Sequence, residues 1–351
     1  MKNKLIVWLT LLITGCSNDW EFLQPQDKID VIWPSGCLVV HKDFTQDDLF
    51  ERIDHVVKTY GLSGVDCHKE DISMSDSIGD TYSNSDQKRA EAFYKILHAP
   101  ETKAIWVGKG GFGSSQILEI FEQRQWSLPM RRVPIIGFSD ATYLHLLAHV
   151  NQWPSLHAPM VTLLQETADI MGNPSMNKEA NIVQLMGVLK GEITEVAYTL
   201  DVLNPSILSH FPPDRIFSTT VVGGNLSVIL RNIGSSTALN PDGCMIFLED
   251  TDEFFNRGRD HLTHLIRAGV FDHVAAIFFG DWTLKGIPLE ELIDDFDQTL
   301  RKRGIHIPIL KSSGFGHGPV NQVLPLGTKS TLQFTQDGKA ILKCSVNQSG
   351  Y

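Results

Sequence analysis

The first half of the chain alternates short apolar runs with longer amphipathic ones. Short apolar runs predict strands, and apolar positions that recur every three to four residues predict helices. The expected strands cover residues 30–40, 104–107 and 133–137, and the expected helices begin at Thr45, at Ser85, near Ser114 and after Ser139. Strands that alternate with helices predict a parallel sheet covered on both faces, which binds ligands beyond the carboxyl ends of its strands.

The second half mixes strands and helices less regularly. Expected strands cover 219–222, 244–250 and 274–282, expected helices cover 262–268 and 289–302, and a hairpin turns at Asp337-Gly338. Between the halves, residues 165–215 carry a weak pattern with one helix over Lys178–Leu189. The pattern of the second half therefore predicts a smaller α/β or α+β domain.

The length of the chain, 351 residues, exceeds the size at which one hydrophobic core usually stops growing. We therefore expect an α/β protein with two domains, the N-terminal one a Rossmann-like or flavodoxin-like parallel sheet. The expected divisions are a leader (1–16), a tether (17–29), an N-terminal domain (30–165), a variable interdomain region (166–215) and a C-terminal domain (216–351).

The first sixteen residues have the pattern of an export signal. Lys2 and Lys4 precede an apolar run over 5–13, which is too short to span a bilayer. The end of this segment resembles the lipobox of bacterial lipoproteins, which implies lipidation at Cys16 and a membrane-anchored protein facing the periplasm or cell envelope. The alternative is an uncleaved start with an incidental cysteine.

Composition limits the partners and the metal chemistry. A formal net charge of −11 argues against a nucleic-acid partner, because phosphate binding needs clustered Lys and Arg. Cys37, Cys67, Cys244 and Cys344 show no CxxC pair and no zinc-ligand spacing. Cys37 and Cys67 are the better-placed pair for a disulfide, and buried free thiols are the simpler alternative.

Candidate chemistry begins at Ser139, which follows the apolar strand Val133–Gly137 and precedes a helix. A sharp strand-to-helix turn can expose a serine hydroxyl for attack on a carbonyl. The alternative is that Ser139 and Asp140 only cap the helix.

A nucleophilic serine needs a base and an orienting acid. His317 lies between glycines in the segment SGFGHG (313–318), and Glu249 and Asp250 end an apolar strand, so either could be the acid. Two metal sites are the alternatives to a serine triad. One pairs His145 with His149 at helical i, i+4 spacing, and the other is an acidic cation site formed by Asp250, Asp252 and Glu253.

The glycine-rich segment VGKGGFG (107–113) could supply a backbone N–H to an oxyanion, and the residue after such a serine, Asp140, could supply another. A dinucleotide site is the alternative, because Gly108, Gly110 and Gly113 satisfy G-x-G-x-x-G. Asn225 follows two glycines and either touches substrate or stabilises the turn.

Taken in order, these segments (the glycine loop, GFSD, GGNL, LED and GHG) resemble the LD-carboxypeptidase family of serine peptidases, to which microcin-immunity peptidases are related. The resemblance covers roughly residues 30–330. It implies Ser139 as nucleophile, His317 as base and Glu249 as acid. It also implies oxyanion donors at Gly111 and Asp140, and an active site in the interdomain cleft.

The family resemblance further implies hydrolysis of the terminal D-alanine of peptidoglycan tetrapeptides through an acyl-enzyme, with no metal or organic cofactor. Muropeptides would be the partners, and a homodimer is one option for assembly. Two alternatives stay open: a microcin-immunity-type peptidase that cleaves aminoacyl-nucleotide amides, and a non-catalytic lipoprotein that binds wall peptides.

Overall fold

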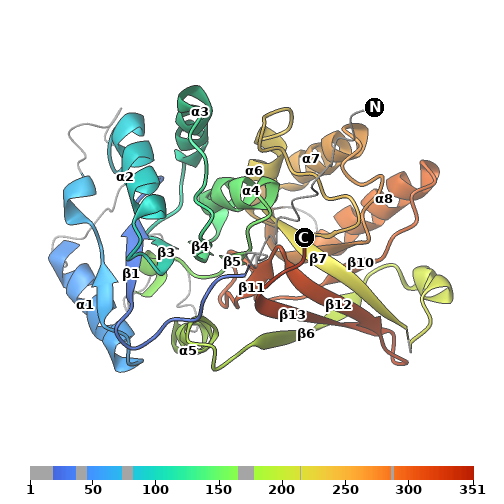
Figure 1. Cartoon of the computed structure of the whole chain (residues 1–351). Coiled ribbons are helices and arrows are strands. Elements are labelled where there is room, and N and C mark those ends of the chain that lie inside the picture. Colours follow the sequence, from blue (N-terminus) through green and yellow to red (C-terminus); the bar gives the residue numbers. More distant parts are fainter. Residues whose placement is uncertain (1–18, 37–45, 73–81, 165–177, 214, 286–287) are drawn as a thin grey trace, which may run out of the picture.

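The computed structural model describes residues 19–36, 46–72, 82–164, 178–213, 215–285 and 288–351. Within these ranges the chain forms a mixed α/β fold with two sheets side by side (Figure 1). No helix in the described ranges has the length and apolar character needed to cross a bilayer. Cys16, the predicted lipidation site, and Thr45, the predicted start of a helix, lie outside these ranges.

The N-terminal sheet has six strands and matches the predicted parallel architecture. In spatial order the strands are β11 (Leu324–Leu326), β5 (Ser155–His157), β4 (Ile135–Gly137), β3 (Ala104–Val107), β1 (Lys28–Ile32) and β2 (Gly64–Asp66). All pairs are parallel except β11 with β5. The order 2-1-3-4-5 is that of flavodoxin-like sheets, whose ligands bind at the carboxyl edge.

Helices flank this sheet as expected from their amphipathic patterns. They are α1 (Gln46–Thr59), α2 (Asp86–His98), α3 (Ser114–Arg124) and α4 (Thr142–Val150). The predicted start of α2 at Ser85 is confirmed, because Ser85 Oγ caps the helix by accepting a hydrogen bond from the Lys88 amide. Strand β5 was not predicted, since three residues are too few to show a period.

The C-terminal half closes into a seven-stranded barrel, which the sequence did not predict. Its order is β10 (Ile309–Lys311), β6 (Glu195–Val202), β13 (Lys339–Ser349), β12 (Thr328–Phe334), β7 (Ile216–Asn225), β8 (Met245–Phe254) and β9 (Ala276–Lys285). The hairpin at Asp337-Gly338 is confirmed by the pairing of β12 with β13. Helices α6 (Leu226–Arg231), α7 (Phe255–Arg267) and α8 (Leu289–Lys302) accompany the barrel.

The region predicted to be a variable interdomain region contributes to a core cluster that the two sheets share. Helix α5 (Lys178–Leu189) occurs where predicted and lies near the junction of the two sheets in Figure 1. Strand β6 was missed, although its burial alternates strictly along the strand. It pairs with β13 and β10 and is therefore an integral barrel strand.

The segment expected to be a tether is packed against the fold from its third residue. Trp20 and Leu23 are buried in the same core cluster as β1. The Leu23 amide donates to the Leu189 carbonyl, and the Ser349 amide donates to Asp19. Buried apolar side chains and these hydrogen bonds together hold the segment against the fold.

Three of the four cysteines after Cys16 lie in the described part of the chain. Cys67, Cys244 and Cys344 are free thiols among the described residues, and Cys67 and Cys344 are buried. Cys37 lies outside the described residues, so its pairing with Cys67 stays a prediction.

Candidate active site

Ser139 occupies a strained turn at the carboxyl end of β4. Its φ is 60°, in the left-handed region, and a 3₁₀ turn over Ser139–Ala141 leads directly into α4. A non-glycine residue in this conformation costs about 1–2 kcal/mol. The surrounding structure must therefore hold the turn, and the strain distinguishes Ser139 from an ordinary helix cap.

The side chain of Asp140 anchors this turn. It is 3 % exposed and accepts hydrogen bonds from Ser35 Oγ at 2.6 Å and from the Ser114 amide at 2.9 Å. Burial raises the pKa of Asp140, and these hydrogen bonds and the charge of Arg89 oppose that rise. The carboxylate thus joins the turn to the start of α3, and the predicted oxyanion role concerns only the backbone N–H of Asp140.

Ser139, His317 and Glu249 lie in one hydrogen-bonded line. The distance from Ser139 Oγ to His317 Nε2 is 3.2 Å, and His317 Nδ1 lies 2.6 Å from Glu249 Oε2. Glu249 is fully buried, whereas Ser139 and His317 are half-buried. The three side chains therefore have the spacing of a catalytic triad.

Strand geometry separates Glu249 from its neighbour Asp250. Successive side chains of a strand point to opposite faces, and only Glu249 contacts His317. Asp250 instead accepts hydrogen bonds from Asn225 Nδ2 at 3.2 Å and from Ser227 Oγ at 2.8 Å. The residues alone left the two acids open and the family resemblance favoured Glu249, which in the structure is the one beside the imidazole.

The acidic cation site has a partial counterpart. Asp250, Glu253 and His261 bring one donor atom each to within 4.8 Å of one another, and Asp252 is not in this group. Asp250 is already bonded to Asn225 and Ser227 at the start of α6. This member of the cluster therefore also stabilises the N-terminus of α6.

The electrostatic environment favours the protonated form of His317. Burial alone would lower the pKa of His317. The charge and hydrogen bond of Glu249, with the charges of Asp250 and Asp281, outweigh burial and raise this pKa above its ordinary value. Such a shift stabilises the imidazolium that a base becomes after accepting a proton.

The glycine loop lies against the serine. A Cβ added at Gly110 would stand 3.3 Å from Ser139 Oγ, and the Gly110 carbonyl accepts from the Gly36 amide at 3.1 Å. Gly111, the predicted oxyanion donor, has a φ of 117°. The buried guanidinium of Arg89 donates to the Gly113 carbonyl at 2.9 Å and holds the end of the loop.

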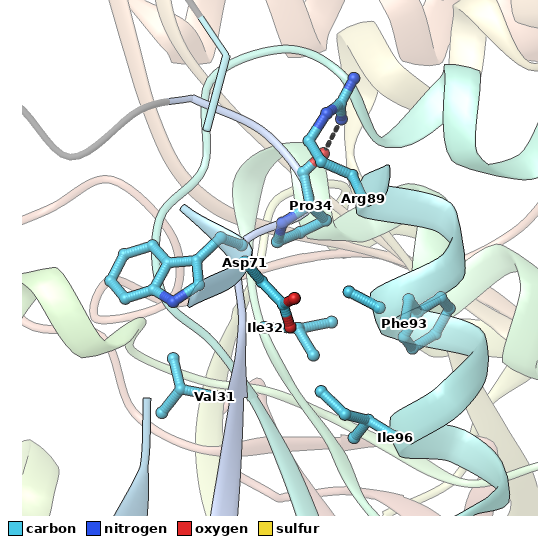
Figure 2. A pocket seen from close by; sticks show the side chains of 9 residues that line it. Val31, Ile32, Pro34, Asp71, Arg89, Phe93 and Ile96 are labelled. Atoms are coloured by element: carbon cyan, nitrogen blue, oxygen red, sulfur yellow. Dashed lines mark hydrogen bonds between the residues drawn. The ribbon is translucent and has the colours of Figure 1, made fainter. Parts of the chain in front are cut away.

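Arg89 also borders a small hollow between β1 and α2, shown in Figure 2. There its guanidinium turns away from the hollow and bonds the Pro34 carbonyl, while the Asp71 carboxylate lies next to Ile32. Neither Ser139 nor His317 lines this hollow. It is therefore separate from the candidate site.

Three other predicted site residues have structural partners. Asn225 is buried, caps α6 through the bond from the Val228 amide to its Oδ1, and donates to Asp250. The ring of His145 bonds the Gly137 carbonyl and Ser155, and the ring of His149 bonds Tyr351 and the Asn240 carbonyl. Substrate contact by Asn225 stays a prediction.

Sequence reasoning missed three residues near His317. His157 is fully buried, its ring lies 5.8 Å from that of Phe138, and neither ring nitrogen has a partner among the described residues. Asp281 and Asn321 bond the backbone of the loop 313–318. The Gly280-Asp281 pair inside an apolar strand was a usable signal, because an isolated glycine in a strand indicates a bulge.

Comparison with known proteins identifies the family. Residues 29–158 match the LD-carboxypeptidase N-terminal domain, and residues 218–332 match the LD-carboxypeptidase C-terminal domain. The chain belongs to the LD-carboxypeptidase family. It is thus a carboxypeptidase, as its relatives are named.

Some relatives of this chain are named for murein peptides. The murein tetrapeptide carboxypeptidase of Pseudomonas aeruginosa is 24 % identical over 250 residues, which cover 70 % of this chain and 78 % of that protein. Among solved structures, the muramoyltetrapeptide carboxypeptidase of Oxalobacter formigenes has a TM-score of 0.68 at 19 % identity, covering 91 % of this chain and 98 % of that one.

A second solved structure represents the related branch. MccF in complex with glutamyl sulfamoyl guanosine has a TM-score of 0.71 at 17 % identity, covering 95 % of this LD-carboxypeptidase chain and 99 % of its own. At these identities the two structures establish the shared fold.

Proposed function

We propose that this protein is a serine LD-carboxypeptidase that hydrolyses the amide before the terminal D-alanine of peptidoglycan tetrapeptides. The observation that carries the proposal is the hydrogen-bonded line from Ser139 Oγ through His317 to Glu249. Its strained serine lies at the carboxyl edge of a parallel sheet, where such folds bind ligands. Relatives named for murein tetrapeptides support the substrate class.

In the proposed first step, Ser139 Oγ attacks the carbonyl carbon of the scissile amide while His317 Nε2 accepts the hydroxyl proton. Glu249 holds His317 through Nδ1–H and stabilises the imidazolium. The backbone N–H groups of Gly111 and Asp140 receive the developing oxyanion. Loss of one such donor typically costs about 3 kcal/mol of transition-state stabilisation.

Collapse of the tetrahedral intermediate then releases the leaving group. His317 returns its proton to the departing nitrogen, D-alanine leaves, and the peptide remains esterified to Ser139. Water, deprotonated by His317, attacks this ester and regenerates the hydroxyl. Ser139 belongs to the N-terminal sheet domain, whereas Glu249 and His317 belong to the barrel half. Substrate would therefore bind between the two domains.

The alternative substrate is an aminoacyl-nucleotide amide, as suggested by the fold shared with MccF. The same proposed residues could cleave it, so geometry does not separate the two substrates. A lipid anchor at Cys16 would favour the wall peptide, because a nucleotide-linked substrate is cytoplasmic.

A substrate panel distinguishes these possibilities. Purified protein would be incubated with a disaccharide-tetrapeptide ending in D-alanine, with the same compound ending in L-alanine, and with a glutamyl sulfamoyl nucleoside. We expect turnover of the first compound alone. Turnover of the nucleoside alone would assign the protein to the microcin-immunity branch. Turnover of none of the three compounds would favour a peptide-binding role.

A further inference from the structure

The loop that carries His317 is held by two side chains outside the proposed triad. Residues 313–318 have almost no side-chain mass of their own beyond Phe315 and His317, so the loop depends on external contacts. Three consecutive backbone N–H groups before His317 donate to side-chain oxygens. Gly314 and Phe315 donate to Asp281 Oδ2, each at 2.9 Å, and Gly316 donates to Asn321 Oδ1 at 2.9 Å.

Asp281 reaches the loop because β9 is bulged opposite Glu249. Leu248 pairs with Phe279 and Asp250 pairs with Trp282, so one residue of β8 faces two residues of β9, Gly280 and Asp281. Bulges of this kind redirect a side chain next to a site. A Cβ at Gly280 would stand 2.5 Å from the Phe315 carbonyl oxygen, so the loop lies directly on the bulge.

Asp281 contacts the loop on both sides of His317. Its own amide donates to the Phe315 carbonyl at 2.8 Å, and a Cβ added at Gly318 would stand 2.4 Å from Asp281 Oδ2. Asn321 is fully buried, and its Nδ2 has no partner among the described residues. Among the described residues, the side-chain oxygen of this buried amide accepts from the Gly316 backbone, so Asn321 holds the loop just before His317.

We propose that Asp281 and Asn321 are positioning residues, which clamp the backbone of the loop 313–318 and so place His317 between Glu249 and Ser139. The inference rests on the proposed role of His317 as the base. Neither residue touches the reacting atoms, since each acts through the backbone of the loop.

The clamp also has an electrostatic consequence. The groups that act on His317 are Glu249 and Asp250 on β8, Asp281 on β9 and His157 on β5. Asp281 is one of three carboxylates that raise the pKa of His317 against the effect of burial. Removing the charge of Asp281 should therefore lower that pKa, whereas removing a carboxylate that is not among these groups should leave it unchanged.

The kinetic test compares Asp281→Ala, Asp281→Asn and Asn321→Ala with Asp297→Asn. Asp297 on α8 is a matched control, because it also accepts two hydrogen bonds, from Asn204 Nδ2 and Arg301 Nε. We expect Asp281→Ala to lower kcat for D-alanine release about 10²-fold, the size expected for a misplaced catalytic group, with KM unchanged. Asn321→Ala should lower kcat as well. Asp281→Asn, which retains an oxygen acceptor, should lose less.

The second measurement needs no substrate. The imidazole of His317 would be titrated by NMR in the full chain and assigned by its absence in His317→Gln. We expect Asp281→Asn to move the titration midpoint to lower pH and Asp297→Asn to leave it in place. Should Asp281→Ala fail to fold, Asp281→Asn decides the kinetic part.

An unchanged kcat in the folded Asp281 and Asn321 variants overturns the clamp, and an unmoved midpoint overturns the electrostatic effect of Asp281 on His317. If wild-type protein releases no D-alanine, the proposed function fails, and the titration alone then decides whether Asp281 acts on His317. The two failures are therefore distinguishable.

Discussion

At the scale of residues, two adjacent carboxylates provide a matched pair. Glu249 contacts His317 Nδ1, whereas Asp250 contacts Asn225 and Ser227. We expect Glu249→Gln to lower kcat by roughly 10⁴-fold, the loss seen when the acid of a serine triad is neutralised. Asp250→Asn should lose far less activity. Steady-state kinetics on variants with matched circular dichroism would check this, and equal losses in both variants would contradict the assignment of Glu249.

The pH dependence follows from the same imidazole. His317 can accept a proton only when neutral, and its surrounding carboxylates raise its pKa above the ordinary 6.5. Activity should therefore be lost as pH falls through the raised pKa, and the acidic limb of kcat/KM should have its midpoint above 6.5. A midpoint below that value in wild-type protein would indicate that burial outweighs the carboxylates.

At the scale of elements, the loop that carries His317 lies tightly against β8. Gly316 has a φ of 112°, and a Cβ there would stand 2.6 Å from Glu249 Oε2. We expect Gly316→Ala to separate Glu249 from His317 and to reduce kcat strongly.

Gly234→Ala is the control for backbone strain. Its φ is also positive, at 86°, but a Cβ there meets nothing within 4 Å. This variant should lose about 1–2 kcal/mol of unfolding free energy and keep its kcat. Denaturant unfolding and steady-state kinetics measure both, and equal activity in the two variants would contradict the proposed importance of this approach.

Elements with a clear period could be predicted from the sequence, and others could not. Helix α2 and its Ser85 cap, and the hairpin at Asp337-Gly338, depend on local chemistry and occur as expected. Strand β5 has three residues, too few to show alternation. Strand β6 alternates in burial, but the apolar Ala197 occupies one of its exposed positions and blurs the alternation in a region otherwise lacking pattern.

The candidate site shows the same division. Ser139, Glu249 and His317 could be predicted because strand ends and glycine-flanked turns mark them locally, supported by the family resemblance. Asp281 and Asn321 could not, because their role arises from a bulge and from contacts between separate segments. Long-range contacts of this kind leave no period in the sequence.

At the scale of the whole molecule, one strand ties the two halves together. Shortly after the histidine loop, β11 pairs with β5 of the N-terminal sheet, and the chain then enters the barrel through β12. The amide of Val323, just before β11, donates to Gln184 on α5 at 2.9 Å. This connection fixes the half that carries His317 relative to the half that carries Ser139. Barrel closure depends on pairing between β9 and β10, which no local pattern reveals.

Localisation is also a property of the whole protein. We expect the chain to be exported and to carry lipid at Cys16, because the segment that ends at Cys16 resembles a lipobox. Wild-type protein should incorporate labelled fatty acid and partition into detergent, and Cys16→Ser should do neither. A wild-type protein that remains unlabelled in the cytosol would instead favour the nucleotide-amide substrate.

The most direct test of the central claim is mass spectrometry of a disaccharide-tetrapeptide treated with wild-type protein and with Ser139→Ala. Loss of one D-alanine from the tetrapeptide with the wild type, and no loss with the variant, is the predicted result. Release of D-alanine by Ser139→Ala at the wild-type rate would contradict the account, because the reaction would then proceed without the proposed nucleophile.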